Sequence, residues 1–331
     1  MQIGVIGAGS WGTTLANLLA VSGHHVILWA REPEVVQSIN AFHENEMFLK
    51  ACRLEENLTA TGDLASVVMG ADMLVSAPPS HAVRPLMRNI TTILASPVPV
   101  VSASKGLEPE TFHTMTSVIA EELDGCPVVA LSGPSFAREV YARMPTAVVA
   151  ASDDRAACVL AQQAFSTSDF RVYTGRDVVG VQLGGALKNV VAIAAGILEG
   201  LGLGYNPRAA LITRGLAETS RLGAVLGADP QTFAGLAGMG DLILTATGAL
   251  SRNRSLGVEL GHGKTLDEAM AGKHTVAEGV NTAAVAVELG KRAGVELPIA
   301  SEVCRILFEH KDPQEAIRDL MERELKAEVW E

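Results

Sequence analysis

The sequence predicts an α/β fold in which a doubly wound, mostly parallel sheet is followed by an all-helical part. Two observations lead to this prediction. Short apolar runs alternate with helical patterns over the first half of the chain, and beyond about residue 177 helical patterns take over. Alternating strands and helices form β-α-β units, which build a parallel sheet covered on both faces. We expect one domain over residues 1–180 and a second over 181–331, with a ligand cleft between them.

Apolar runs rich in β-branched residues predict the strands of the sheet. They are Gln2–Ile6, Val26–Ala30, Met73–Ser76, Val98–Ser102, Val128–Leu131, Ala147–Ala151 and Phe170–Tyr173. Helical spacing predicts Trp11–Ser22, Pro33–Phe42, Asp63–Met69 and Ser80–Leu94, and one more helix between the last two strands. Ser80 is expected to cap its helix.

The second half predicts a long, nearly uncharged helix over Gly180–Gly200 and several shorter helices after it. The shorter ones are Pro207–Leu222, Pro230–Leu236, Leu266–Met270, Val280–Arg292, Ile299–Glu309 and Pro313–Lys326. No Pro- or Ser-rich linker separates the two halves. We therefore expect two domains that pack on each other.

Composition narrows the class of protein. The 331 residues are 48% hydrophobic and 19% charged, which is typical of a folded globular chain. Lys and Arg number 26 and Asp and Glu number 37, which gives a net charge of −11. Because the basic residues form no dense run, we do not expect a nucleic-acid partner. An anionic ligand would need a few basic side chains that converge locally.

The cysteines and the N-terminal segment indicate the compartment. Cys52, Cys126, Cys158 and Cys304 are widely spaced, so neither a disulfide framework nor a metal site is expected. Residues 1–30 carry no Asp, Glu, Lys or Arg, but five glycines and several polar residues interrupt them. They lack the basic start of a signal peptide, and no integral membrane segment is expected. We expect a cytoplasmic protein.

The strongest motif is Gly7-Ala8-Gly9-Ser10-Trp11-Gly12, which follows a strand and opens a helix. In a dinucleotide-binding loop, Gly7 permits the tight turn and Gly9 admits a pyrophosphate close to the backbone. Gly12 lets the helix pack closely on the strand, and the helix N-terminus attracts the phosphates. The alternative is an ordinary glycine-rich turn. The strand–turn–helix context favours a Rossmann-type nucleotide site.

The residue that follows the second strand indicates whether the cofactor is NADH or NADPH. An acidic residue there would hold a ribose 2′-hydroxyl, whereas an arginine accommodates a 2′-phosphate. This strand ends at Ala30 and is followed by Arg31 and Glu32. Arg31 favours NADPH without excluding NADH, unless it is only a solvated surface residue.

Lys188 is the candidate catalytic residue. It lies in the predicted helix Gly180–Gly200, which has no other charge before Glu199, and it shares a face with small and apolar residues. Such a lysine either extends to solvent or lines a cleft, where burial adjusts its pKa. The adjacent Gly184 and Gly185 make the helix less stable. This cost would be explained if a nicotinamide ring had to approach the helix closely.

Other isolated polar residues lie in segments rich in small residues. Lys105 and the pair Gly133 and Ser135 follow strand ends, which line the ligand crevice of a parallel sheet. Asp241 lies in an uncharged segment. Ser251, Arg252, Asn253 and Arg254 supply donors for a phosphate, or else form only a helix cap with exposed arginines.

The order of these segments resembles a known family. GAGSWGTTLA, SASKGLEPET, LSGPSFAREV, GALKNVVAIAAGI, NPRAALITRGLAE, GMGDLILT, SRNRSLG and VAEGV occur in sequence. Together they resemble bacterial-type glycerol-3-phosphate dehydrogenase [NAD(P)+], from residue 2 to beyond residue 300. The resemblance implies a C-terminal domain of the 6-phosphogluconate dehydrogenase type.

The resemblance also implies roles for individual residues. Those implied to contact the cofactor, besides the glycines of the motif, are Ser10, Trp11, Arg31, Lys105, Ala137, Arg252, Val276 and Glu278. Those implied to surround the substrate are Lys105, Gly133, Ser135, Lys188, Asp241, Ser251, Arg252 and Asn253. Lys188 matches the proton-transferring lysine of the family. No metal is implied.

The expected reaction is reversible reduction of dihydroxyacetone phosphate to sn-glycerol 3-phosphate, with NADPH favoured over NADH, in glycerophospholipid biosynthesis. We expect Lys188 to donate the proton, Asp241 to keep its pKa in the working range, and Arg252 and Asn253 to hold the phosphate. A homodimer is a further expectation. The alternatives are a related two-domain hydroxy-acid dehydrogenase, a ketopantoate-type reductase or a non-catalytic NAD(P)-binding sensor.

Overall fold

The computed structural model describes residues 1–272, 277–325 and 327–328, and within these residues eight strands form one sheet. The order across the sheet is β10-β9-β8-β7-β6-β1-β2-β5. The strands are β1 (Gln2–Ile6), β2 (His25–Trp29), β5 (Leu58–Thr61), β6 (Met73–Ser76), β7 (Val100–Ser102), β8 (Val128–Ser132), β9 (Thr146–Ala151) and β10 (Phe170–Gly175). The β8–β9 pair is antiparallel and the others are parallel, which confirms the predicted mostly parallel sheet.

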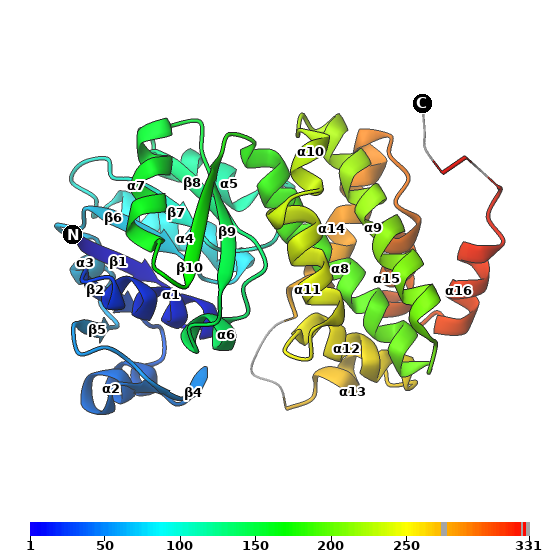
Figure 1. The fold of residues 1–331 in the computed structure, drawn as a ribbon, viewed down its shortest axis with the longest axis horizontal. Helices are drawn as coiled ribbons and strands as arrows, with labels where there is room; N and C mark the ends of the chain where they lie inside the picture. The colour runs from blue at the N-terminus through cyan, green and yellow to red at the C-terminus, as the bar shows by residue number, and fades with distance from the viewer. Residues whose placement is uncertain (273–276, 326, 329–331) are drawn as a thin grey trace.

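Two helical layers cover this sheet (Figure 1). Buried residues of α1 (Ser10–Val21), α2 (Pro33–Phe42) and α7 (Arg155–Phe165) form one hydrophobic cluster with the sheet. Those of α3 (Leu64–Val68), α4 (Ser80–Thr91) and α5 (Met115–Glu122) form a second cluster. The short α6 (Ala137–Tyr141) packs against α1. In the sheet, β1 lies between β2 and β6, so the strand order reverses at β1. Ligands of such sheets bind at this switch point.

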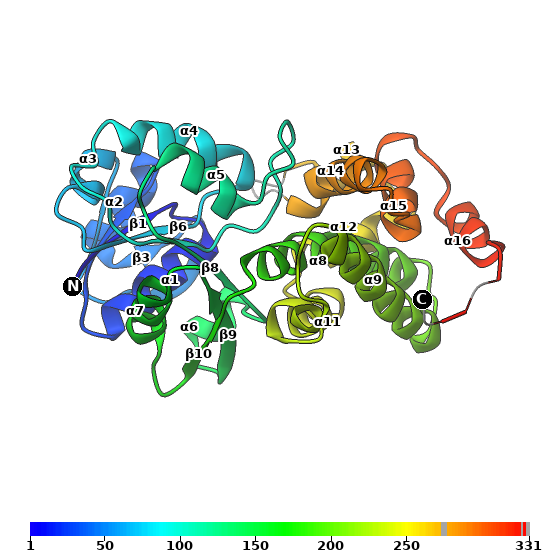
Figure 2. The ribbon, with the colours of Figure 1, turned by 90° about the horizontal axis from the view of Figure 1, so that it is seen from above.

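The C-terminal lobe is helical and is built around α8 (Val178–Gly200). It contains α9 (Tyr205–Val225), α10 (Pro230–Phe233), the π-helical turn η1 (Leu236–Gly240), α11 (Asp241–Thr247), α12 (Arg252–Gly261), α13 (Leu266–Met270), α14 (Glu278–Ala293), α15 (Pro298–Phe308) and α16 (Pro313–Met321). Figure 2 shows α8 leading from the sheet into this lobe, where it packs against α9, α11, α12 and α14. Its 23 residues are buried over nearly their whole length.

Two pairs of glycines allow α8 and α12 to approach closely. A Cβ added to Gly196 would lie 2.0 Å from the Arg254 carbonyl oxygen, and one added to Gly257 would lie 2.0 Å from the Ile193 carbonyl oxygen. Gly200 and Gly261 repeat the arrangement one turn further along. The backbones therefore touch without intervening side chains, and the N-terminus of α12 is fixed relative to α8.

α8 is also long and apolar enough to cross a membrane, with a mean hydropathy of 1.6 over an 18-residue window. However, 89% of that window is buried inside the protein. Pro230–Thr247 and Arg252–Gly261 pass the same test only if these two segments, bent by 47°, are counted as one span. The apolar character of α8 is explained by its place at the centre of the helical lobe.

The sequence missed several elements of the sheet lobe. The hairpin of β3 (Glu44–Asn45) and β4 (Leu49–Arg53), the edge strand β5 and helix α5 were not predicted. The strands are short and carry polar or charged residues, so they give no apolar run. The helix that starts at Pro313 ends at Met321, before the predicted Lys326, which lies outside the described residues.

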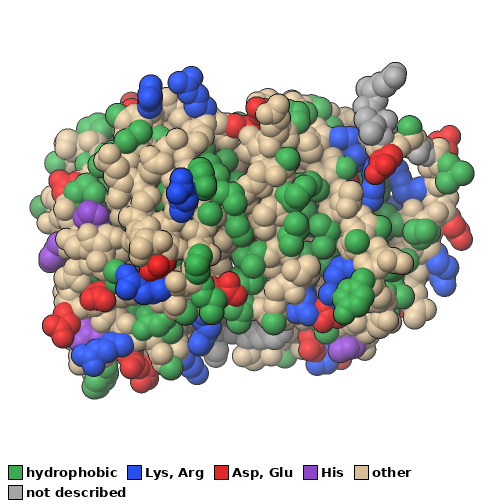
Figure 3. Space-filling view, in the orientation of Figure 1, with side chains coloured by type: hydrophobic (Ala, Val, Ile, Leu, Met, Phe, Trp, Pro, Cys, Tyr) green, Lys and Arg blue, Asp and Glu red, His purple; other side chains and the backbone are tan. Residues whose placement is uncertain are grey.

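Charged and apolar side chains are unevenly distributed on the surface. In Figure 3, hydrophobic side chains spread over the face formed by α9 and α11, whereas many charged ones lie toward the two ends of the molecule. Tyr205, Met239, Ile243 and Leu250 are exposed apolar residues of this region.

Candidate active site

The glycine loop is shaped by close backbone contacts. Gly7 has φ +108°, and a Cβ there would lie 2.9 Å from the Pro78 nitrogen. A Cβ on Gly12 would lie 1.8 Å from the Gly7 carbonyl oxygen. Gly9 differs, because nothing lies within 4 Å of the position its Cβ would take. Gly7 and Gly12 thus maintain the turn, and Gly9 leaves open space in front of the N-terminus of α1.

That open space fits the phosphates of a dinucleotide. Gly9 is the N-cap of α1 and provides no side chain to accept from the first backbone N–H groups of the helix. Free N–H groups and the positive end of a helix form an anion site. The buried Trp11 Nε1 has no partner in the described protein, whereas the Ser10 hydroxyl donates to the Phe48 carbonyl oxygen. The residues present at the switch point therefore fit a dinucleotide.

Arg31 follows β2 at the edge of this loop. Its side chain is 80% exposed and pairs with Glu32, with Nη2 2.7 Å from Oε1. The guanidinium is therefore held by an acidic neighbour on the surface, and it is accessible to an anionic group.

Two lysines meet one carboxylate between the lobes. Asp241 Oδ2 accepts from Lys105 Nζ at 2.6 Å, and Asp241 Oδ1 accepts from Lys188 Nζ. Lys188 Nζ also donates to Thr245 Oγ1 at 2.9 Å, and Lys105 Nζ to the Gly133 carbonyl oxygen at 3.2 Å. Lys188 and Asp241 are buried and Lys105 is partly buried. Of the two alternatives for Lys188, the structure excludes extension to solvent, because the ammonium is buried against Asp241 and Thr245.

Burial sets the acidity of Lys188. Loss of solvent lowers its pKa from the usual 10.5 to about 7; the Asp241 charge opposes this and the Lys105 charge adds to it. A buried ammonium loses hydration, and a like charge nearby disfavours it further. An amine with a pKa near neutrality can both release and accept a proton at physiological pH.

The glycines beside Lys188 have a different purpose from the one predicted. A Cβ on Gly184 would lie 2.6 Å from the Ala237 carbonyl oxygen in η1. A Cβ on Gly185 would lie 2.8 Å from Ser132 Oγ and 3.7 Å from the Lys105 side chain. They make room for the protein's own backbone and side chains rather than for a nicotinamide ring. This close packing brings Asp241, the first residue of α11, up to Lys188.

The residues after β8 line the same edge of the sheet. Gly133 has φ +147°, and an added Cβ would lie 2.8 Å from the Val148 Cα, so only glycine fits. Ser135 donates to the Gly133 carbonyl oxygen at 3.0 Å. Ala137 begins α6, and its carbonyl oxygen accepts from Thr14 of α1 at 3.3 Å. Gly133 therefore lies beside the lysines, whereas Ala137 lies beside the glycine loop.

The side chains of the Ser251–Arg254 segment differ in whether they bond to the rest of the protein. Ser251 caps α12 by accepting from the Arg254 nitrogen, and Arg254 pairs with Glu199 of α8. Asn253 is buried, donates to Asn189 Oδ1 at 2.9 Å and accepts from the Gly279 nitrogen at 3.0 Å. Arg252 makes no hydrogen bond or ion pair with the described residues. In this segment Arg252 is thus the arginine whose donors are not used by any described residue.

Glu278 joins the lobes at the start of α14. Its Oε2 accepts from Ser80 Oγ at 2.8 Å and its Oε1 from the Ser80 nitrogen at 3.4 Å. Ser80 was predicted to cap α4, but Pro79 occupies the N-cap position and the Ser80 hydroxyl faces Glu278 instead. Val276, the other residue implied here, lies outside the described residues.

The sequence did not identify Thr245, Ser80 or Asn189 as parts of the site. Thr245 follows Asp241 by one helical turn, and Asn189 is adjacent to Lys188. For Thr245 and Asn189 this spacing was the only signal in the sequence, where Ser80 lies near no candidate residue. Among the described residues, no three His, Cys, Asp or Glu side chains gather in a way that would hold a metal ion.

Comparison with known proteins agrees with this geometry. Residues 2–158 match the family model described as NAD-dependent glycerol-3-phosphate dehydrogenase N-terminus, and residues 177–318 match the corresponding C-terminus. A glycerol-3-phosphate dehydrogenase [NAD(P)+] from Geobacter sp. (strain M21) is 54% identical, over 99% of this chain and 98% of its own length.

Solved structures give the same result. The crystal structure of glycerol-3-phosphate dehydrogenase from Coxiella burnetii matches with a TM-score of 0.94 and 39% identity, covering 97% of this chain and 99% of its own. A PanE/ApbA family ketopantoate reductase from Ralstonia eutropha matches with a TM-score of 0.61 and 18% identity, covering 96% and 100%, so it shares the fold. The chain therefore belongs to the NAD-dependent glycerol-3-phosphate dehydrogenase family.

Proposed function

We propose that this protein is an NAD(P)-dependent sn-glycerol-3-phosphate dehydrogenase that reversibly reduces dihydroxyacetone phosphate to sn-glycerol 3-phosphate. The observation that carries the proposal is the buried Lys188–Asp241–Lys105 cluster, in which two side chains of the helical lobe meet a lysine that follows β7 of the sheet lobe. Residues 1–180 would hold the cofactor, and residues 181–331 would provide the proton donor and most of the substrate contacts.

Lys188 is the proton donor in this proposal. In its ammonium form it donates a hydrogen bond to the ketone oxygen and stabilises the negative charge that develops there. When bound, the reduced nicotinamide supplies the hydride that the carbonyl carbon receives. Lys188 then releases its proton to the oxygen and becomes a neutral amine; in the reverse direction the amine takes the proton back.

Asp241 and Lys105 prepare Lys188 for this step. Asp241 fixes the direction of the Lys188 side chain and keeps its pKa from falling further. Lys105 shares the carboxylate, so the three side chains carry one net positive charge when both lysines are protonated. That charge attracts an anionic substrate against the negative charge of the whole chain.

The phosphate of the substrate would bind at the start of α12. Arg252 has no hydrogen-bond or ion-pair partner among the described residues and can form two parallel hydrogen bonds with a phosphate. Asn253 has one amide hydrogen beyond its bond to Asn189. Binding energy from the phosphate, remote from the reacting carbon, then aligns the ketone with Lys188.

The cofactor contacts are assigned to the loop and the strand ends. Ser10, Trp11 and the three glycines would lie against the pyrophosphate, with Ala137, Lys105, Arg252, Val276 and Glu278 around the rest of the dinucleotide. We propose NADPH as the favoured cofactor because the exposed Arg31 guanidinium can reach a 2′-phosphate. The adjacent Glu32 limits this preference, since it already pairs with Arg31.

The proposal is tested by following cofactor oxidation with dihydroxyacetone phosphate. We expect turnover with this ketone and little with 2-keto acids, including ketopantoate. Preference for a 2-keto acid would contradict the substrate assignment, and cofactor binding without turnover of any carbonyl compound would indicate a sensor.

The cellular assignments remain proposals as well. A role in making the glycerol phosphate backbone of phospholipids, in the cytoplasm, follows from the proposed product. Depletion of the protein should lower the cellular sn-glycerol 3-phosphate pool. Light scattering after size exclusion tests the homodimer, for which the exposed apolar side chains near α9 and α11 offer a surface.

A further inference from the structure

Residues 106–114, here named the strap, connect β7 to α5 and cross to the helical lobe. Leu107 is only 1% exposed and belongs to the hydrophobic core of that lobe, and Phe112 packs against the same core. Arg292 of α14 lies over the Phe112 ring, 4.1 Å from its centroid. Figure 2 shows the strap as a narrow hairpin that extends toward α14. The strap is thus part of both lobes.

The hairpin is closed by its own backbone. Leu107 and Thr114 form an antiparallel bridge, and the Glu108 nitrogen donates to the His113 carbonyl oxygen at 2.9 Å. Lys105 immediately precedes the strap, and Gly106, the first residue of the strap, turns the chain with φ +154°. Because so few bonds separate Lys105 from Glu108, a displacement of the strap would be transmitted to the Lys105 ammonium.

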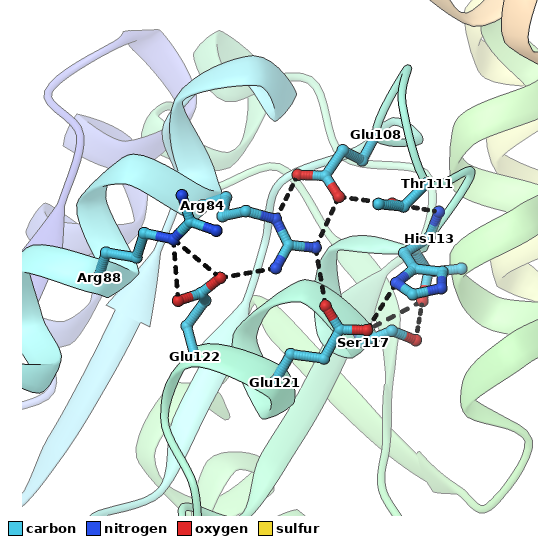
Figure 4. Close-up of polar contacts among 9 residues, drawn as sticks. Arg84, Arg88, Glu108, Thr111, His113, Ser117, Glu121 and Glu122 are labelled. Carbon is cyan, nitrogen blue, oxygen red and sulfur yellow. Dashed lines mark hydrogen bonds and ion pairs between the residues drawn. The ribbon is translucent and has the colours of Figure 1, made fainter.

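Glu108 anchors the strap to the sheet lobe, where His113 of the strap also contacts Glu121 of α5 at 2.7 Å (Figure 4). Arg84 of α4 donates to both of its oxygens, from Nε at 2.7 Å and from Nη2 at 2.6 Å. The same guanidinium contacts Glu122 at 2.6 Å and Glu121 at 2.8 Å in α5. One arginine therefore ties the strap to two helices.

This ion pair differs from an ordinary surface pair. The side chains of Arg84 and Glu108 are 16% and 14% exposed, and the pairing is bidentate. Exposed single-contact pairs contribute little, whereas bidentate arginine–carboxylate pairs fix both distance and direction. The Arg84 hydrogen bonds lower the pKa of Glu108 against its partial burial, so the carboxylate stays charged.

We propose that Arg84 is a positioning residue that acts through Glu108 and the strap to hold the Lys105 ammonium at Asp241. The inference rests on the proposed function, since it assigns Arg84 to the same reaction. Arg84 touches neither lysine, so its effect on catalysis passes through the backbone of residues 105–108.

The test compares Arg84→Gln with Glu108→Gln, and uses Arg88→Gln as the control. Arg88 contacts Glu122 from a 65% exposed position and does not touch the strap. The chain has eight lysines, so ¹³C-labelled lysine gives a spectrum in which the Lys188 titration can be followed without turnover. Lys105→Met serves as the reference for complete loss of the Lys105 charge.

The two variants change charge in opposite directions. If they acted on Lys188 only through the electric field, Arg84→Gln would raise its pKa and Glu108→Gln would lower it. If they displace Lys105 from Asp241, both raise the pKa of Lys188, by up to the shift seen in Lys105→Met. We expect both to raise it and Arg88→Gln to leave it unchanged. A Glu108→Gln shift that is absent or downward overturns the proposal.

Kinetics give the second readout. We expect Arg84→Gln and Glu108→Gln each to lower kcat by about 10- to 100-fold, the order produced by a misplacement of about 1 Å. The double variant should be no slower than the worse single one, because both break the same connection. Independent, additive losses overturn the proposal. If the wild type fails to reduce dihydroxyacetone phosphate while both pKa shifts occur, the proposed function fails and the positioning role stands.

Glu108→Gln keeps the test valid if Arg84→Gln does not fold. It leaves Arg84 with Glu121 and Glu122, so the contact between α4 and α5 survives. The Lys188 titration in Glu108→Gln then decides whether Lys105 is displaced, since the expected rise in the pKa of Lys188 is opposite to the direct effect of the lost charge.

Discussion

The glycine loop and the lysine cluster are built in opposite ways. The loop uses backbone alone: Gly7 and Gly12 hold the turn, and Gly9 leaves space. The cluster uses buried charged side chains that come from positions 105, 188 and 241. A site made by consecutive residues can be read from a sequence, whereas a site made by distant residues depends on the packing of η1 against α8.

The largest effect should come from Lys188→Met, which removes the charge from the cluster and leaves the loop intact. We expect kcat to fall about 10²- to 10⁴-fold, the usual contribution of a general acid. NADPH affinity, measured by fluorescence, should change little. Activity that stays within a few-fold of wild type would show that the cluster is not the proton source.

Gly9→Ala tests the loop without disturbing the cluster. The added methyl meets nothing within 4 Å in the protein, and Gly9 has φ −64°, which alanine adopts freely. We expect an unchanged Tm and a Kd for NADPH raised about tenfold or more, because the methyl occupies the space of the pyrophosphate. The matched Gly12→Ala should lower Tm, since its methyl meets the Gly7 carbonyl oxygen at 1.8 Å. Equal affinity in Gly9→Ala and wild type would place the pyrophosphate elsewhere.

Arg252→Ala tests the proposed contact between the start of α12 and the substrate phosphate. Charged hydrogen bonds contribute about 1.5–3 kcal/mol, so KM for dihydroxyacetone phosphate should rise about 10- to 100-fold. Arg254→Ala is the matched comparison, because Arg254 pairs with Glu199 and should affect stability more than KM. An unchanged KM in Arg252→Ala would exclude this arginine as the phosphate ligand.

The pH dependence of kcat/KM tests how Asp241 affects the pKa of Lys188. Reduction requires protonated Lys188, whose pKa is about 7, so kcat/KM for the ketone should fall as pH rises through that value. Asp241→Asn removes the charge that raises this pKa, and the fall should begin about 1–3 units lower. A fall that moves to higher pH would mean that Asp241 does not stabilise the ammonium.

Arg31→Ala should give the smallest effect, because the side chain is 80% exposed and paired with Glu32. We expect a loss of a few-fold in kcat/KM with NADPH and almost none with NADH, consistent with the weak energies of exposed charge pairs. Equal losses with both cofactors would contradict 2′-phosphate recognition.

Sequence reasoning succeeded where an isolated residue was chemically unusual. Lys188 and Asp241 are lone charges in uncharged segments, and both lie in the cluster. It failed where a residue's partner is distant: Gly184 serves the backbone of η1, and Ser80 contacts Glu278 rather than its own helix. Asn253 stays a predicted phosphate ligand through its remaining amide hydrogen, while the rest of its amide connects α8 with α14.

Leu107 lies in the sheet half of the sequence and is buried in the helical lobe. A chain divided before α8 would leave this side chain without its hydrophobic surroundings, and would leave the other fragment with a gap in its core. The boundary in sequence is therefore not a boundary in folding. During synthesis the sheet lobe emerges first, and the strap can reach its final place only after α14 has been made.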